Sequence, residues 1–153
     1  MTTEIAYERR QGSAAEIAAL LLPLCAEIFP GFDGSYLTRR LPTIQDVDLW
    51  LAREGERVVG FKLGYRRGPQ LLYSWLGGVH PSARRAGVAG KLMELQHRHA
   101  AEAGYGLIET RTRASNNAMI ILNLRSGFTV TGFEIDSAGI PIVTQRKDLC
   151  QPT

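Results

Sequence analysis

The spacing of apolar residues changes along the chain, and each spacing predicts one type of element. Apolar side chains recur every three or four residues over 17–28 and again over 88–95, the period of a helix with one buried face. Ser13 and Glu16 have the spacing of a capping box, so we expect the first helix to begin there. Pro23 should kink this helix or end it early, because proline cannot donate the helical hydrogen bond.

Shorter runs with strand character, separated by glycine and proline, predict strands between the helices. Gly77 and Gly78, near the end of one run, predict a β-bulge there. We expect strands over 4–9, 47–53, 57–65, 70–79, 105–113, 128–135 and 140–149, and helices over 13–28, 35–41, 87–103 and 116–126. This order predicts a mixed sheet with helices on its faces, an α/β or mixed α+β architecture.

The composition is that of a globular protein. The length of 153 residues fits a single domain, 1–153, and apolar residues make up 44% of it. The longest apolar run, 17–26, has ten residues and contains a proline, whereas a membrane span needs about 20. The first ten residues carry two glutamates and no apolar core. We therefore expect neither a membrane span nor a signal peptide.

The net charge and the positions of histidine and cysteine limit the classes of ligand that we expect. A net charge of +3 suits an anionic ligand, but no stacking aromatic motif accompanies the four arginine pairs, so we expect no nucleic acid partner. His97 and His99 are two residues apart on a predicted helix and point to different faces, so we expect no metal. Cys25 and Cys150 form no C-x-x-C pair, which indicates reduced thiols and a cytoplasmic location.

The segment Val79–Leu92 carries the clearest chemistry. A strand ends, a short loop with Arg84 and Arg85 follows, and a helix begins near Gly87. The first turn of a helix leaves backbone N–H groups unpaired at its positive end, so it can bind a phosphate. The small residues of this turn allow close approach, and the two arginines add charged donors. The segment is neither G-x-G-x-x-G nor a P-loop, which argues against a dinucleotide or a nucleoside triphosphate.

The spacing R-x-x-G-x-A at Arg84–Ala89, preceded by V-x-P at Val79–Pro81, resembles the phosphate loop of the GNAT superfamily of N-acetyltransferases. Two further segments are similar to that family. One is Asn116-x-x-Met-x-x-Leu-Asn-x-x-x-Gly-Phe, ending at Phe128, and the other is the predicted hairpin that contains Gly55–Phe61. The order of the predicted elements also matches over nearly the whole chain.

The resemblance implies a GNAT fold, with a twisted mixed sheet of about seven strands and four helices. The fourth and fifth strands would splay around acetyl-CoA, the acetyl donor, with its pyrophosphate on the loop and its pantetheine arm along the fourth strand. The residues implied in binding it are Gly77, Gly78, Val79, Arg84, Arg85, Ala86, Gly87, Val88, Ala89, Gly90, Asn116 and Asn123.

The catalytic positions depart from the family pattern. The family's usual Tyr, which protonates the leaving thiolate, corresponds to Asn123, and its usual Glu base corresponds to Arg111. Neither side chain can do that proton transfer, although Asn123 can hydrogen-bond the sulfur or order a water. Tyr73 could hold a water chain, and Glu109 is the nearest carboxylate to serve as base. The alternative is a structural pair of Glu109 with Arg111 or Arg113.

We expect the enzyme to transfer acetyl to a primary amine of a small molecule, by direct attack in a ternary complex. The resemblance implies an acceptor pocket lined by Phe29–Phe32, Tyr36, Trp75 and the hairpin Phe133–Ile142. Glu27 or Asp33 could hold the ammonium group there. Two alternatives remain open, a catalytically weakened acyl-CoA-binding sensor or partner protein and an acetyltransferase of protein or peptide amines. The last predicted hairpin offers apolar strands for a homodimer.

Overall fold

The computed structural model describes residues 4–149, so Cys150 and its expected reduced state lie outside the described residues. The helices are α1 (Ala14–Ile28), α2 (Gly34–Arg40), α3 (Val88–Glu102) and α4 (Asn117–Arg125), with short 3-10 helices at Leu41–Thr43 and Pro81–Ala83. The strands are β1 (Ile5–Arg10), β2 (Gln45–Glu54), β3 (Arg57–Gly68), β4 (Leu71–Val79), β5 (Leu107–Arg113), β6 (Thr129–Ile135) and β7 (Pro141–Asp148).

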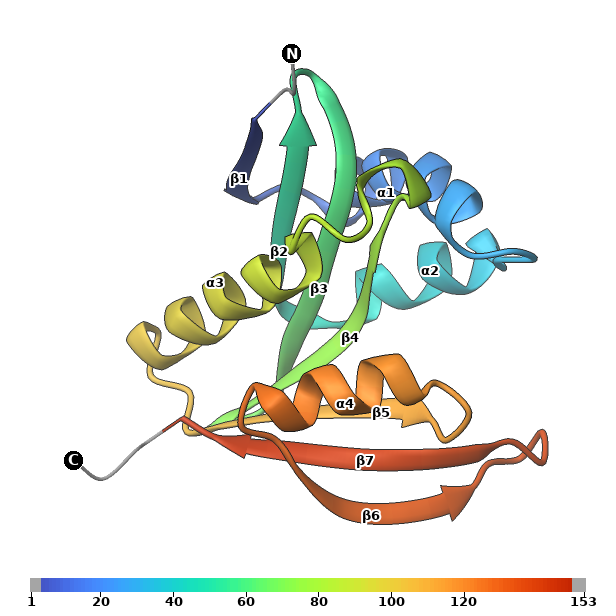
Figure 1. The fold of residues 1–153 in the computed structure, drawn as a ribbon, viewed down its shortest axis with the longest axis vertical. Coiled ribbons are helices and arrows are strands. Elements are labelled where there is room, and N and C mark those ends of the chain that lie inside the picture. The colour runs from blue at the N-terminus through green and yellow to red at the C-terminus, as the bar shows by residue number, and fades with distance from the viewer. Residues whose placement is uncertain (1–3, 150–153) are drawn as a thin grey trace.

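The described strands form one seven-stranded sheet in the order β1-β2-β3-β4-β5-β7-β6. Neighbouring strands run antiparallel except for β4 and β5, which are parallel and are joined through α3. The mixed α/β architecture expected from the sequence is therefore confirmed (Figure 1).

Two layers of helices cover the sheet. The buried residues of α1 and α2 pack with Leu49, Leu51, Phe61 and Leu63 in one core. On the opposite face, Val88 and Leu92 of α3 pack over β2 and β3 in a second core. Side chains alternate along a strand, so neighbouring residues of β3 serve these two faces in turn. The middle of the sheet therefore has a separate apolar core on each face.

Helix α1 begins as expected but does not end early. Ser13 Oγ accepts a hydrogen bond from Glu16 N at 3.1 Å, and Ser13 N donates to Glu16 Oε1 at 3.1 Å, which completes the capping box. Pro23 lies inside the helix, which continues to Ile28. The expectation of an early end was wrong because the apolar face on both sides of Pro23 is buried in the core, and this packing outweighs one lost hydrogen bond.

The β-bulge lies at Trp75, so its prediction at Gly77 and Gly78 was wrong. Ser74 pairs with Gly64 and Leu76 pairs with Leu63, which leaves Trp75 as the extra residue. Gly77 and Gly78 pair regularly with β3. The lack of a side chain at Gly78 instead allows α1 and the residue after it to pack closely on β4, since a Cβ on Gly78 would lie 2.8 Å from the Ile28 side chain and 2.9 Å from Phe29.

The strands β4 and β5 separate directly beyond this bulge. Their last pair is Ser74 with Thr110, although β4 continues to Val79 and β5 to Arg113. Figure 1 shows the two strands leaving their shared end at an angle. Beyond Ser74, the edge of β4 that faces β5 therefore pairs with no strand among residues 4–149. This wedge offers backbone donors and acceptors to a ligand.

Candidate functional site

The loop between β4 and α3 presents backbone amides at the positive end of a 15-residue helix. Gly87, the residue before α3, has a φ of 73° and makes no side-chain cap, so no such cap occupies the first-turn amides. Arg85 has a left-handed φ of 69°, a conformation that costs an ordinary residue about 1–2 kcal/mol. Strain of this kind concentrates at binding sites, and left-handed residues turn nearby amides into an anion-binding concavity.

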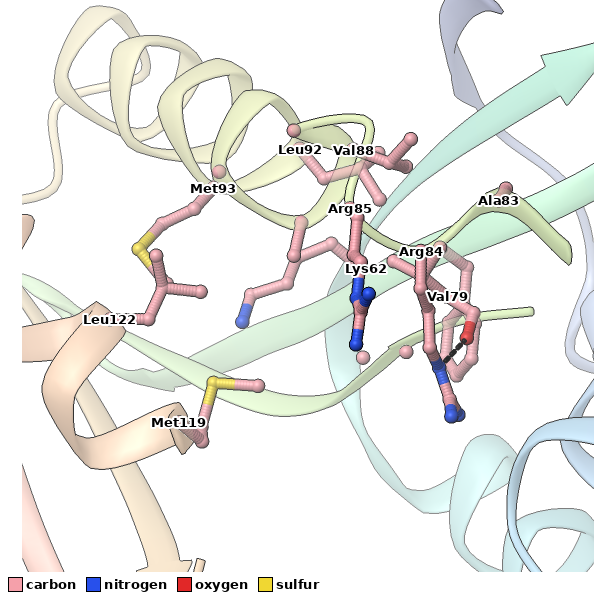
Figure 2. A pocket seen from close by; sticks show the side chains of 16 residues that line it. Lys62, Val79, Ala83, Arg84, Arg85, Val88, Leu92, Met93, Met119 and Leu122 are labelled. Atoms are coloured by element: carbon pink, nitrogen blue, oxygen red, sulfur yellow. Dashed lines mark hydrogen bonds between the residues drawn. The ribbon is translucent and has the colours of Figure 1, made fainter. Parts of the chain in front are cut away.

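Arg84 and Arg85 extend from this loop over the cavity below it (Figure 2). Arg84 Nε donates to Val79 O at 3.1 Å, which ties the loop to the end of β4. Neither guanidinium has a carboxylate partner among the described residues, so both are available to a phosphate. A Cβ on Gly87 or on Gly90 would meet nothing within 4 Å, so the loop has room for a large anion.

A cavity of about 470 Å³ runs from this loop between α3 and α4. Its size and its mainly apolar walls fit a ligand-binding site. Most of the residues predicted to bind the cofactor line this cavity: Gly77, Gly78, Val79, Arg84, Arg85, Gly87, Val88, Ala89 and Gly90. Ala86 is absent from the lining. Sequence reasoning missed the apolar walls formed by Leu92 and Met93 of α3 and by Met119 and Leu122 of α4.

Two further cavities continue from this one through the wedge. The wedge cavity, about 230 Å³, lies between Ser74–Gly77 of β4 and Thr110–Arg113 of β5 and shares Lys62, Gly77 and Met119 with the first. The aromatic cavity, about 690 Å³, shares Phe29, Leu76 and Arg113 with the wedge. Each cavity shares walls with the next, so the three adjoin one another from the phosphate loop, past the open edge of β4, to the side covered by α1 and α2.

Residues predicted for the acceptor line the far end of this series of cavities. Phe29, Phe32 and Tyr36 line the aromatic cavity, and Trp75, the bulged residue, lines the wedge. The expected contribution of the hairpin 133–142 was wrong, because none of its residues lines the three cavities. The Phe29 and Phe32 rings lie 5.8 Å apart, and the Tyr36 and Trp75 rings lie 5.9 Å apart. These aromatic faces suit an apolar or aromatic ligand group.

Asp33 and Glu27, the two acidic residues considered for the ammonium group, already have partners within the protein. Asp33 lines the aromatic cavity, but its Oδ1 accepts from Ser35 N at 3.0 Å as the cap of α2. The hydrogen bonds to Ser35 lower the pKa of the Asp33 carboxyl, so it stays charged. Glu27 instead lies 2.9 Å from His80 Nε2 and lines none of the cavities described above.

Glu109 is held by two arginines that sequence reasoning did not select. Its Oε2 accepts from Arg146 Nε at 2.7 Å, and its Oε1 accepts from Arg67 at 3.4 Å. The alternative considered from the sequence, a structural ion pair, named the wrong partners, Arg111 or Arg113; Arg111 pairs instead with Glu134 of β6. Glu109 is buried and lines none of these cavities, so its geometry favours an ion-pair role over that of a base.

Tyr73 and Asn123 also lie outside the lining of the three cavities. Tyr73 is buried beneath Arg67, whose guanidinium lies 4.4 Å above the ring, and burial raises the pKa of its phenol. Asn123 is 1% exposed and donates to Gln145 Oε1 at 2.9 Å, which turns it toward β7. Asn116 does line the wedge, where its Oδ1 caps α4 by accepting from Met119 N at 3.2 Å.

Lys62 is the ionisable residue that sequence reasoning missed. It lies on β3 opposite Gly77 and lines both the first cavity and the wedge. Burial lowers the pKa of its amine to about 8. The signal in the sequence was a single lysine within the otherwise apolar strand segment Val58–Tyr65.

Other expectations concern groups away from these cavities. Cys25 is buried, and burial raises the pKa of its thiol to about 11, which makes it unreactive. Within residues 4–149, no cluster of three or more His, Cys, Asp and Glu side chains is placed to hold a metal ion. Among the described helices, none has the length and apolar character that crossing a membrane requires.

Comparison with protein families gives one match that covers most of the chain. The family model described as an acetyltransferase (GNAT) domain matches residues 27–149. This range includes the phosphate loop, both splayed strands and the aromatic cavity. No curated protein sequence matches the chain.

Solved structures match the whole fold at low sequence identity. The ribosomal-protein-S18-alanine N-acetyltransferase of Escherichia coli has a TM-score of 0.81 at 12% identity, covering 98% of this chain and 97% of that one. An IAA acetyltransferase of Bacillus cereus has a TM-score of 0.77 at 16% identity, covering 95% and 99%. A GNAT family acetyltransferase of Elizabethkingia anophelis, solved with acetyl-CoA bound, has a TM-score of 0.73 at 14% identity, covering 94% and 97%.

Proposed function

Because the chain belongs to the GNAT family of acetyltransferases, we propose that it transfers the acetyl group of acetyl-CoA to a primary amine of a small molecule. The observation that carries this proposal is the series of three adjoining cavities, with an anion site at one end and aromatic walls at the other. Donor and acceptor would enter from opposite sides of the sheet and meet in the wedge, as direct attack in a ternary complex requires.

The donor end has the parts that acetyl-CoA needs. The left-handed loop residues, the first turn of α3 and the two free guanidinium groups suit its pyrophosphate. The apolar channel between α3 and α4 suits the pantetheine arm, whose amides can pair with the open edge of β4. Backbone N–H groups at the start of the wedge would polarise the thioester carbonyl.

The acceptor end favours a neutral amine. Arg111 and Arg113 line the wedge, and Arg113 has no ion-pair partner among the described residues. A nearby positive charge disfavours a protonated amine, so these arginines would help an ammonium group lose its proton on entering the wedge. The aromatic cavity would hold the apolar part of the acceptor, which is our reason to prefer a small molecule over a peptide.

Calorimetry with acetyl-CoA tests the donor site. In Gly87→Glu the added carboxylate would extend into the anion site, since no atom lies within 4 Å of the Cβ position. Gly87→Asn is the matched control, because asparagine tolerates a left-handed φ and carries no charge. We expect wild type and Gly87→Asn to bind with similar Kd, and Gly87→Glu to bind at least about tenfold more weakly. Equal affinity of all three proteins would contradict the donor site.

We further propose that two copies of the chain associate through β6 in the cytoplasm. This edge strand carries the exposed apolar side chains Val130, Phe133 and Ile135, which are 54%, 65% and 56% exposed. Sedimentation of wild type and Phe133→Ser should show a dimer that the substitution weakens. A monomeric wild type at micromolar concentration would contradict the proposal.

A further inference from the structure

The amine of Lys62 lies where the donor channel meets the wedge. Lys62 pairs with Gly77 across β3 and β4, and its side chain runs over that glycine. A Cβ on Gly77 would lie 3.0 Å from Lys62 Cδ and 3.6 Å from Lys62 Nζ. Figure 2 shows the amine directed into the cavity, toward the side that α4 forms with Met119 and Leu122. Lys62 and Gly77 both line the wedge as well.

This amine has no structural partner to explain it. No carboxylate forms a hydrogen bond or an ion pair with Lys62 among residues 4–149. Burying an unpaired cation among apolar walls costs free energy, and a methionine would fill the same space without that cost. The amine is therefore placed for the ligand, and its lowered pKa, about 8, makes proton release accessible near neutral pH.

The side of the sheet decides which part of the ligand Lys62 would face. Gly60 and Gly64, the neighbours of Lys62 on the same face of β3, lie against Val88 and Gln96 of α3. Lys62 therefore lies on the side of the phosphate loop, from which the donor enters. The aromatic cavity lies on the other side of the sheet. A donor extending through the wedge would place its acyl group beyond Lys62 and its sulfur beside the amine.

No other side chain of the channel or the wedge can supply a proton to that sulfur. The remaining ionisable residues of both linings are Arg84, Arg85, Arg111 and Arg113, which stay protonated. Asn123, at the position of the family's usual Tyr, is turned to Gln145. The serine and threonine hydroxyls of the wedge are far weaker acids than a lysine ammonium.

We propose that Lys62 is the catalytic acid that protonates the sulfur of CoA as the thioester breaks. The proposal rests on the acetyl transfer proposed above. The lone pair of the acceptor amine attacks the carbonyl carbon, a C–N bond forms, and the C–S electron pair passes to sulfur. The Lys62 ammonium gives its proton to that sulfur, while the proton lost by the acceptor nitrogen leaves to water. The neutral Lys62 then regains a proton from water.

The first test needs only the binary complex with CoA. The thiolate of bound CoA is titrated by its ultraviolet absorbance in wild type, Lys62→Met and Lys62→Arg. A cation beside the sulfur favours the thiolate. We therefore expect the acid dissociation constant of the bound thiol to be at least about tenfold larger in wild type and Lys62→Arg than in Lys62→Met. Equal constants in the three proteins would overturn the contact between Lys62 and sulfur.

The second test separates proton donation from charge alone. With the best acceptor from an amine panel, we expect kcat to fall about 100-fold in both Lys62 variants, while the Kd of acetyl-CoA changes less than about threefold. The wild-type kcat should decline above a pH near 8, and both variants should lack this decline. Full activity in Lys62→Arg would overturn the proton-donor role, and so would full activity in Lys62→Met.

These outcomes distinguish failure of Lys62 from failure of the proposed function. An active wild type with equally active Lys62 variants would refute the catalytic role of Lys62 and leave the proposed acetyl transfer standing. A wild type that binds CoA but acetylates no amine would refute the transfer reaction, and the thiol titration would still decide whether Lys62 faces sulfur. Lys62→Met should keep the thermal midpoint of wild type or raise it, which shows that the variants fold.

Discussion

Acidification should destabilise the protein through one buried histidine, His97 of α3. The imidazole is 6% exposed, and its ring packs edge-on against Phe128 at 5.4 Å between centroids. Its Nδ1 lies 3.0 Å from Lys147 Nζ, so it accepts the hydrogen bond of an ammonium group, as only a neutral imidazole can. Burial, followed by the charges of Lys147 and Lys62, lowers the pKa of His97 to about 3.

The sign and size of the effect follow from proton linkage. An unfolded histidine has a pKa of about 6.5. Below that pH the unfolded state therefore binds a proton on this histidine that the folded state does not bind. Stability is therefore full above pH 6.5 and is lost as the pH falls toward the folded value of about 3. Between pH 7 and pH 5, His97 alone should remove about 2 kcal/mol from the free energy of unfolding.

Urea unfolding of wild type and His97→Gln at pH 7, 6 and 5 measures this contribution. Carboxylates titrate alike in both proteins, so their effect cancels in the difference. We expect the wild type to lose about 2 kcal/mol more than His97→Gln between pH 7 and pH 5. Parallel losses in the two proteins would contradict this prediction, because they would mean that His97 takes up its proton in the folded state.

Three further changes test the core, the acceptor pocket and the ion-pair centre. Leu21→Ala, at a fully buried position of α1, should lower the free energy of unfolding by about 2–5 kcal/mol in urea, and a loss below about 1 kcal/mol would contradict the packing. Trp75→Ala and Phe32→Ala should raise the acceptor KM while sparing the Kd of acetyl-CoA, and unchanged acceptor kinetics would count against the aromatic pocket. Glu109→Gln should lower the thermal midpoint, because Arg146 loses its charged partner, and should leave kcat within about threefold; a 100-fold loss would restore Glu109 as the base.

The elements and the donor loop were predictable because local sequence determines them. The capping box of Ser13, the cap Asn116 and the glycine at the start of α3 act within a few residues of themselves. Periodicity likewise indicated the helices, and the mixed α/β architecture followed from the order of the elements along the chain. The early end expected at Pro23 was wrong because the deciding contacts are long-range ones with the sheet.

The contents of the wedge were harder to predict because they depend on partners distant in sequence. Glu109 meets Arg146 through the pairing of β5 with β7, and it meets Arg67 of β3 across the intervening β4. The bulge at Trp75 depends on the register against β3 and leaves no local signal in β4. Lys62 becomes a candidate only when α3 and α4 enclose it. A single sequence shows the charge of such a residue but not the walls around it.

Acetyl transfer itself is the most direct test of the proposed function. Acetyl-CoA labelled in its acetyl group is incubated with a panel of small primary amines, including aromatic ones, and with amino-terminal peptides. We expect at least one small amine to gain the labelled acetyl in an amide, in equal amount to the CoA released, and we expect Gly87→Glu to abolish the product. Tight binding of acetyl-CoA with no labelled amide on any amine would contradict the enzymatic proposal and favour an acyl-CoA-binding sensor. Label on peptides alone would contradict the small-molecule acceptor.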